Sequence, residues 1–299
     1  MATKEEYQKT LERIKVIQGH LEKATRGGRL AGKVCIVTGA GSLNGIGRAS
    51  AVQFAHEGAK HLYLLDFNGD NFPALVELLK KRYPDVGVTT KECDAADEEA
   101  IKGVIEQSLK EHGRLDVFFA NAAIATGAPL TSTDREDLEE TLRVNVQSCF
   151  LALKHGSEAM KVTSKDKPRS GGSIVMTASV AGLRSGAGSV DYSASKAAVI
   201  SLAATGAWQL AKTDIRVNAI CPGLIETGMT QITFEQARSR GSEGKIGQLN
   251  PTGRYGVSQE IAHAVTFLAS DEATYVNGIA MPVDGGLAAS HPVVPGRFH

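Results

Sequence analysis

A short apolar run, followed by closely spaced glycines and then by a helical pattern, constrains the fold of this chain more than any other feature. The apolar run is 33–38, and the helix after it is expected to extend to about residue 58. Four glycines lie between them: Gly39, Gly41, Gly45 and Gly47. A strand, a glycine-rich turn and a helix in this order are typical of a phosphate-binding unit, in which main-chain amides approach the phosphates closely.

The same alternation of strand-like and helix-like segments continues along the chain. Further strands are predicted at 61–66, 87–93, 115–120, 172–179, 214–220 and 279–283. Further helices are predicted near 69–83, 97–112, 134–160, 191–212 and 258–269. Such alternation favours parallel strands with helices on both faces. We therefore predict an α/β fold, a single Rossmann-like doubly wound domain with a seven-stranded parallel sheet over about 29–290.

Composition agrees with one large domain. The 299 residues are 42% hydrophobic, enough for a sizeable core, and doubly wound folds often use about 250 residues in one domain. The formal net charge is zero, which gives no electrostatic reason to expect nucleic acid or an acidic membrane as a partner. No run approaches the roughly 18 apolar residues of a membrane span, and the first residues lack a secretory pattern. A cytoplasmic location is expected.

The cysteines are predicted to be buried thiols. Cys35, Cys93, Cys149 and Cys221 lie in or beside apolar segments, and no two of them have a C-x-x-C spacing. Neither a disulfide framework nor a metal site is expected.

A tyrosine and a lysine four residues apart form a candidate acid/base pair. Tyr192 and Lys196 share one face of the predicted helix. An isolated phenol ionises near pH 10, and a cation about 4 Å away favours the phenolate by roughly 4 kcal/mol at an effective dielectric near 20. Ser179 ends the strand upstream, so its hydroxyl is expected to converge with Tyr192 on one substrate oxygen. The alternative is a chance spacing on an exposed helix face.

An acidic residue ends the second strand. Asp66 is positioned to accept a hydrogen bond from a ribose 2′-hydroxyl, and its charge would repel a 2′-phosphate. Phe67 rather than arginine follows it, and 39–47 contains neither lysine nor arginine. The sequence therefore predicts NAD as the cofactor in preference to NADP.

Four further segments complete a recognisable order of motifs. Asn-Ala-Ala occupies 121–123, Val-Asn-Val surrounds Asn145, Pro-Gly-Leu-Ile-Glu-Thr occupies 222–227, and Val-Asp-Gly-Gly occupies 283–286. With the glycine turn and the tyrosine–lysine pair, the chain resembles the short-chain dehydrogenases/reductases across about residues 30–288.

The resemblance implies an oxidoreductase that transfers a hydride between NAD(H) and a secondary alcohol or ketone. It implies four catalytic residues: Asn145, Ser179, Tyr192 and Lys196. Asn145 would hold a water that extends the proton relay, Lys196 would also bind the ribose, and Asp94 would contact the adenine. The residues expected around the cofactor are Gly39, Gly41, Ser42, Asn44, Gly45, Ile46, Gly47, Asp66, Phe67, Asp94, Ala95, Asn121, Ala122, Ala123, Tyr192, Lys196, Pro222, Gly223, Ile225 and Thr227.

Two positions depart from the family pattern. Five residues separate Gly39 from Gly45 where the family has three, and Ala123 stands where the family has glycine. We interpret both as tolerated variation. Two alternatives to a dehydrogenase remain open from the sequence, a cofactor-binding scaffold or regulator without redox turnover, and an epimerase or dehydratase on the same fold.

The segment 224–248 is expected to form a lid over the substrate, and its first part is apolar. An apolar ketone or secondary alcohol would suit it, although these side chains could instead only pack the lid down. Arg184 could meet an anionic group or could remain in solvent. Substrate contacts are expected from Ser179, Ala181, Arg184, Tyr192, Leu224 and Met229.

Two terminal segments lie outside the family core. Residues 1–28 contain an apolar stripe at helical spacing, including Tyr7, Leu11, Ile14 and Leu21. A helix this short is marginal alone, so it should dock on its own subunit or on a neighbour, with 27–28 as a hinge. Binding to a membrane surface is the alternative. The tail 291–299 contains prolines that oppose regular structure.

The helices predicted near 134–160 and 191–212 carry longer apolar or small-residue runs than one sheet-facing stripe requires. In the family, the matching helices pair across two-fold axes. The resemblance therefore implies a homodimer or homotetramer, the alternative being that both helices are covered within the monomer.

Overall fold

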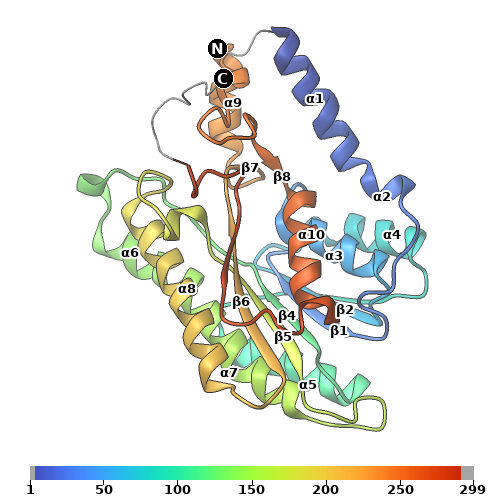
Figure 1. Cartoon of the computed structure of the whole chain (residues 1–299). Helices are drawn as coiled ribbons and strands as arrows, with labels where there is room; N and C mark the ends of the chain where they lie inside the picture. The colour runs from blue at the N-terminus through green and yellow to red at the C-terminus, as the bar shows by residue number, and fades with distance from the viewer. Residues whose placement is uncertain (1–3, 291–299) are drawn as a thin grey trace.

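The computed structural model describes residues 4–290 and contains one seven-stranded parallel sheet (Figure 1). The strand order is β3-β2-β1-β4-β5-β6-β9. The bounds are β1 (Val34–Thr38), β2 (His61–Asp66), β3 (Gly87–Glu92), β4 (Val117–Ala120), β5 (Gly172–Thr177), β6 (Ile215–Pro222) and β9 (Ala280–Val283). The chain order reverses between β1 and β4, and ligands bind at such a switch point in doubly wound folds. The predicted fold and sheet are confirmed.

Side chains of the central strands alternate between two apolar cores. In β1, Val34 and Ile36 belong to one core, whereas Cys35 and Val37 belong to the other. Every residue of β1 is buried. Because helices cover both faces of the sheet, this strand is apolar throughout rather than at alternate positions.

Helices pack on both faces of the sheet (Figure 1). One face carries α3 (Ile46–His56), α4 (Phe72–Arg82) and α10 (Ser258–Ala269), and the other carries α5 (Glu98–His112), α7 (Ser148–Lys161) and α8 (Val190–Gln209). On the first face, Phe54, Leu75 and Ile261 are fully or almost fully buried. On the second, Val104 and Val199 are buried in the same way. Apolar burial on two faces is the main force that stabilises this three-layer arrangement.

The helix predicted near 134–160 is divided into three pieces. It consists of α6 (Arg135–Leu142), the π-helix η2 (Arg143–Gln147) and α7. A π-turn inserts one extra residue per turn and is often found at functional sites. Asn145 lies within this turn and is buried.

The predicted lid contains regular structure that the sequence pattern did not predict. Residues 225–226 form β7 (Ile225–Glu226), which pairs with β8 (Gly256–Val257) in a separate two-stranded sheet. Between them lie α9 (Gln231–Ser239) and η4 (Glu243–Lys245). The segment predicted as the lid is therefore continuous in structure with residues 249–257, up to the end of β8.

The amino-terminal segment forms α1 (Lys4–Gln18) and the short α2 (His20–Lys23). Ile14 of α1 is buried within this chain, so the helix docks on its own subunit. The segment after α2 is held by ion pairs from Arg26 to Asp85 at 2.7 Å and from Arg29 to Glu57 at 2.6 Å. These contacts fix both sides of 27–28, where the sequence predicted a hinge. The predicted tail 291–299 lies outside the described residues.

Between residues 4 and 290, none of the helices has the length and the apolar character needed to cross a membrane. The four cysteines are unpaired, and Cys35, Cys149 and Cys221 are buried as predicted. Cys93 is half-buried.

Candidate active site

A cavity of about 660 Å³ opens where the strands of the sheet reach their carboxyl ends. Gly39 follows β1, Asp66 ends β2, Asn121 follows β4 and Pro222 ends β6, and all four line the cavity. The site thus lies at the switch point of the sheet, where side chains from several strands meet.

Ser179, Tyr192 and Lys196 lie together on the wall of this cavity. Ser179 caps the short 3₁₀ helix η3 (Val180–Gly182), and its Oγ accepts the amide of Ala181 at 3.1 Å. Tyr192 lies in the first turn of α8, and Lys196 follows one turn later. The two loops that lead from β5 into η3 and α8 therefore bring the three groups of the predicted motif to one place.

Lys196 is almost completely buried, and its ammonium group is held in a fixed position. Its Nζ donates to the carbonyl of Thr177 at 2.8 Å and lies 5.4 Å from the centroid of the Tyr192 ring. A buried cation needs hydrogen-bond partners, and an ammonium group has three donors. The Thr177 carbonyl accepts one of these three N–H donors, and the other two are available to a group bound in the cavity.

Asn145 is placed beside the site but does not line the cavity. Its Oδ1 accepts the amide of Ile124 at 2.8 Å, and its Nδ2 donates to the Ile124 carbonyl and to Ser195 Oγ, each at 2.9 Å. Ser195 Oγ in turn donates to the Tyr192 carbonyl at 2.7 Å. Both amide hydrogens of Asn145 are therefore engaged within the protein, and the role of this residue in a proton relay stays a prediction. Its hydrogen bonds connect Ile124, which lines the cavity, to Ser195 of α8.

Asp191 is a positioning residue that the sequence analysis missed. It is fully buried next to Tyr192, and its Oδ2 accepts hydrogen bonds from Thr126 and Thr141, each at 2.9 Å. Burial acts to raise the pKa of its carboxyl, but hydrogen bonds from neighbouring hydroxyls, including these two, outweigh burial and lower it. The carboxylate also lies in the first turn of α8, where negative charge is favoured.

The lengthened glycine turn still leads directly into α3. Gly39 has a φ of +69°, and Gly45 is the N-cap of α3. The added length is taken up by a tight turn, in which the Gly45 amide donates to Ser42 O at 3.0 Å. Ser258 of α10 donates to the carbonyl of Asn44 at 2.5 Å and fixes the turn from outside. A Cβ at position 47 would lie 2.2 Å from the carbonyl oxygen of Gly39, so only glycine allows this approach.

These features fit a dinucleotide. Gly45 gives α3 no side-chain cap, so amides of the first helical turn are available to an anion at the positive end of the helix. Asp66 lines the cavity beyond this turn, where a ribose would lie; its Oδ2 accepts the Gly41 amide at 2.7 Å and its Oδ1 accepts the Asn68 amide at 3.1 Å. Asn121 supports the turn, because its Nδ2 donates to the carbonyls of Thr38 and Gly39.

Most residues expected around the cofactor line the cavity, and three do not. Those that line it are Gly39, Ser42, Gly45, Ile46, Asp66, Phe67, Asp94, Ala95, Asn121, Ala122, Ala123, Tyr192, Lys196, Pro222, Gly223, Ile225 and Thr227. Gly41, Asn44 and Gly47 lie outside the lining and shape the turn through the contacts given above.

Arg143 is a charged residue of the cavity that the sequence analysis missed. It bridges Asp94, at 2.7 Å, and Glu140, at 2.7 Å. The hydrogen bonds to Glu140 and Asp94 raise the pKa of the guanidinium. Asp94 therefore lines the cavity while paired with Arg143. The lone pairs of its carboxylate that Arg143 does not use could accept a hydrogen bond from an adenine.

The substrate contacts predicted from sequence are only partly brought together. Ser179, Tyr192 and Met229 line the cavity, whereas Ala181, Arg184 and Leu224 do not. The guanidinium of Arg184 donates to the carbonyl of Leu287 at 2.6 Å, so it is a structural contact to the chain after β9. Leu224 packs into the apolar cluster under α1, on the far side of the lid. The lining also includes Ile124, Ala125, Gly228 and Thr230, which were not among the substrate contacts predicted from sequence.

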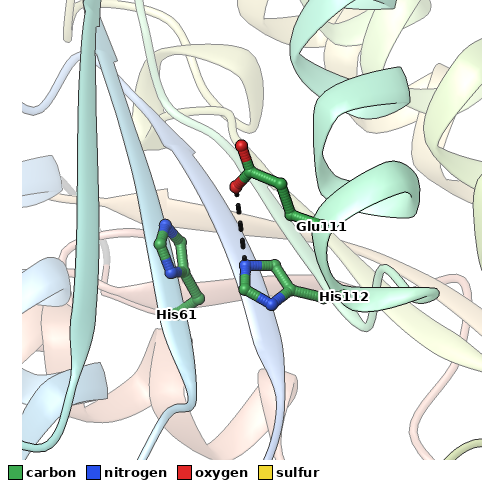
Figure 2. A group of neighbouring side chains, drawn as sticks. All are labelled: His61, Glu111 and His112. Carbon is green, nitrogen blue, oxygen red and sulfur yellow. Dashed lines mark ion pairs between the residues drawn. The ribbon is translucent and has the colours of Figure 1, made fainter.

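A second cluster of potential ligand side chains lies away from the cavity. Figure 2 shows His61, Glu111 and His112, whose nearest ligand atoms lie within 4.8 Å of one another. His61 begins β2, whereas the cavity lies at the other end of that strand. Two members of the cluster already have partners outside it, because His61 Nε2 bonds to Thr89 Oγ1 at 2.9 Å and Tyr63 donates to Glu111 at 2.7 Å. Burial and the neighbouring His112 lower the pKa of His61 to about 4.

Comparison with known proteins agrees with this geometry. A family model described as "Enoyl-(Acyl carrier protein) reductase" matches residues 39–288. A 3-oxoacyl-[acyl-carrier-protein] reductase of Thermotoga maritima is 40% identical over 263 residues, which cover 87% of this chain and 99% of that protein. Levodione reductase of Leifsonia aquatica is 35% identical over 269 residues, which cover 88% of this chain and 97% of that protein.

Two solved structures are also similar. The crystal structure of levodione reductase has a TM-score of 0.80 and 34% identity, covering 88% of this chain and 100% of that chain. A short chain dehydrogenase from Mycobacterium paratuberculosis bound to NAD has a TM-score of 0.76 and 28% identity, with coverage of 88% and 100%. The chain belongs to the short-chain dehydrogenase/reductase family. It is an oxidoreductase that acts on CH–OH groups.

Proposed function

We propose that the protein interconverts an apolar secondary alcohol and its ketone with NAD(H), and that Tyr192 transfers the proton. The observation that carries this proposal is the meeting of Ser179, Tyr192 and Lys196 on one wall of a cavity that also contains the glycine turn and Asp66. A nicotinamide cofactor, when bound, supplies or accepts the hydride. The protein residues then have to orient the substrate and move one proton.

Each of the three polar residues has a separate task. Ser179 Oγ accepts the Ala181 amide, which leaves its hydroxyl proton free to donate to the substrate oxygen. Tyr192 gives the proton to that oxygen in reduction and removes it in oxidation. Lys196 holds its ammonium group 5.4 Å from the centroid of the Tyr192 ring, and its free donors can reach ribose hydroxyls.

Replacement of Tyr192 by phenylalanine tests this assignment. The change removes the proton donor but keeps the ring, so kcat should fall by a factor of roughly 10² to 10⁴. NADH affinity, measured by fluorescence titration, should remain within about twofold, since the glycine turn and Asp66 are untouched. Wild-type activity is found first by following absorbance at 340 nm with a panel of alcohols and ketones. Activity of the variant within tenfold of wild type would contradict the role of Tyr192.

The proposal of NAD rather than NADP rests on charge. Asp66 and Phe67 line the cavity at the end of β2, and the lining contains two basic residues, Arg143 and Lys196. Arg143 is already paired with two carboxylates, and Lys196 belongs to the reaction end. A solved relative is bound to NAD, which supports the same choice.

The apolar character of the substrate is proposed from the lining beside Tyr192. The lining includes the apolar side chains of Ile124, Ala125 and Met229. Of its charged residues, Arg143 is paired with Asp94 and Glu140, and Arg184 lies outside the lining, where it donates to the Leu287 carbonyl. Relatives named levodione reductase and (+)-borneol dehydrogenase support a small substrate of this kind.

We also propose a homodimer or homotetramer in the cytoplasm. The outward faces of α7 and α8 support assembly, because Phe150 and Trp208 are exposed there. The four unpaired cysteines suit a reducing compartment.

A further inference from the structure

We propose that the amino-terminal helix α1 is a positioning element of the active site, which holds the lid over the cavity and thereby sets the affinity for substrate. The helix precedes the region matched by the family model, which begins at residue 39. Figure 1 shows α1 beside β8 and α10, with α9 near the same end of the molecule. Because substrate affinity is measured through turnover, one arm of the test rests on the function proposed above.

The lid has an apolar core that α1 completes. Ile14 is 4% exposed and packs with Phe234 of α9, with Tyr255 just before β8, and with Val257 of β8. Ile17 of α1 and Leu224 and Ile246 of the lid lie at the edge of the same cluster. The described members of this cluster come from α1 and from 224–257. Without α1, the lid would expose much of this apolar surface to water, which is unfavourable.

A second contact is made closer to the start of α1. Tyr7 packs over η4, where a Cβ added at Gly244 would lie 3.6 Å from the Tyr7 Cβ. Burial and the charge of Glu243 raise the pKa of the Tyr7 hydroxyl, which agrees with its position against the lid. Helix α1 is thus attached to the lid at two places about two turns apart.

The lid residues held by α1 are directly connected to those that line the cavity. Glu226 of β7 pairs with Arg238 of α9, and its neighbours in sequence, Ile225 and Thr227, both line the cavity. Thr230 also lines it and donates to the Ile225 carbonyl at 2.6 Å. A displacement of α9 or β8 would therefore move the wall that faces the substrate. Asp66 and the Gly41 amide that it accepts lie outside the lid. Ser258, the residue after β8, donates to the Asn44 carbonyl, so the glycine turn is linked to α1 only indirectly.

Matched substitutions on two faces of α1 test the proposal. Ile14→Asp places a charge in the shared core, whereas Val16→Asp places the same charge at a position that is 73% exposed. Backbone amides of 225–239 are followed by hydrogen–deuterium exchange in the full-length protein. KM for the ketone identified in the panel and the NADH dissociation constant are measured on the same samples.

For Ile14→Asp we expect exchange in 225–239 to accelerate by at least about tenfold. KM should rise about tenfold, and NADH affinity should fall by a smaller factor, because only Ile225 and Thr227 of the expected cofactor contacts belong to the lid. Val16→Asp should match wild type in every measurement. If Ile14→Asp does not fold, Ile14→Ala carries the same test with a smaller change, and Ile14→Val should restore wild-type values.

Lid exchange and KM that stay at wild-type values in Ile14→Asp or Ile14→Ala would overturn the proposal. A fall in thermal stability with no change in either measurement would do the same, because a helix that only stabilises the fold would behave in that way. The exchange arm needs no turnover. Failure of the proposed function at Tyr192 would therefore leave the test of α1 intact.

Discussion

At the scale of single residues, Asp66 has a structural role, and in the proposed function it also selects the cofactor. Its two carboxylate oxygens accept the amides of Gly41 and Asn68, so the side chain helps to hold the glycine turn. A carboxylate oxygen can accept more than one hydrogen bond, so a ribose 2′-hydroxyl can still donate to it. A 2′-phosphate at the same place would meet an uncompensated negative charge.

We predict that the wild-type enzyme has a kcat/KM for NAD at least about tenfold above that for NADP. Asp66→Ala should reduce this ratio, because it removes both the acceptor and the repulsion. Efficiency with NAD should also fall, since the Gly41 amide loses its partner. Asp70→Ala is the control, because Asp70 is exposed and does not line the cavity. An equal kcat/KM of the wild type with NAD and with NADP would show that Asp66 does not select between the two cofactors.

His61 is a residue whose charge state couples to stability. Its pKa is lowered from 6.5 to about 4 by burial and then by the neighbouring His112, so it is neutral in the folded protein at pH 6. The unfolded chain binds a proton below its ordinary pKa of about 6.5, whereas the folded chain does not until about pH 4. The contribution of His61 to stability should therefore be lost as the pH falls from about 6.5 to about 4.

We predict that His61→Gln loses less thermal stability than the wild type between pH 7 and pH 4.5. Glutamine can keep a hydrogen bond to Thr89 and cannot take up a proton in this range. Thermal unfolding followed by circular dichroism at several pH values measures the difference. The same loss of melting temperature in both proteins would mean that His61 is not the group responsible.

At the scale of elements, the start of α8 depends on contacts that come from outside the helix. Asp191 receives hydrogen bonds from Thr126, in the segment over the cavity, and from Thr141 of α6. Asn145 of the π-helix reaches the same helix through Ser195. Three elements thus set the position of the turn that carries Tyr192.

We predict that Asp191→Asn lowers kcat by about tenfold and changes NADH affinity little, because it loosens the turn that carries Tyr192. Because the pKa of Asp191 is lower in the folded chain than in the unfolded chain, its ionised carboxylate stabilises the fold at pH values above the ordinary pKa near 3.9. This stabilisation is lost as the pH falls through the lower pKa of the folded chain. The variant should therefore be less stable than wild type at pH 7, with a smaller difference near pH 3. Unchanged kcat in a correctly folded variant would contradict the positioning role.

The main elements could be predicted from sequence because their signals are local. Buried strands such as β1 are continuous apolar runs. Helix α5 is preceded by Asp97, whose side chain caps it, and followed by Gly113, whose φ is +67°. The π-turn around Asn145 could not be predicted, because it is stabilised by hydrogen bonds to Ile124, which is distant in sequence. The β7–β8 pair was missed because each strand is two residues long.

At the scale of the whole molecule, the candidate site was predictable where a motif lies on one element or directly after one strand. Tyr192, Lys196, Ser179 and Asp66 are of this kind, and all line the cavity. The residues in contact with the substrate were predicted less well. The face of the lid that turns toward the cavity depends on the elements that pack against its other face, and these are distant in sequence. Leu224 turns toward α1 rather than toward the cavity, and Arg184 finds a partner in the chain after β9.

The outward faces of α7 and α8 lead to a prediction about assembly. Phe150 of α7 is 45% exposed and Trp208 of α8 is 79% exposed, although both are large and apolar. Exposed apolar side chains on neighbouring helices favour burial against a second copy, and a two-fold axis would pair each helix with its equivalent. Such pairing would also support α8, the helix that carries Tyr192 and Lys196.

We predict a dimer or tetramer at micromolar concentration, measured by size-exclusion chromatography with light scattering. Phe150→Glu should shift the protein toward the monomer and lower kcat, because a charge at the shared surface would have to be desolvated and α8 would lose its support. Val16→Glu adds the same charge at an exposed position of α1 and should leave the assembly intact, because Figure 1 shows α1 and α7 at opposite ends of the molecule. A wild-type monomer with full activity would refute both the assembly and its support of catalysis. An oligomeric Phe150→Glu variant would instead place the interface on another face.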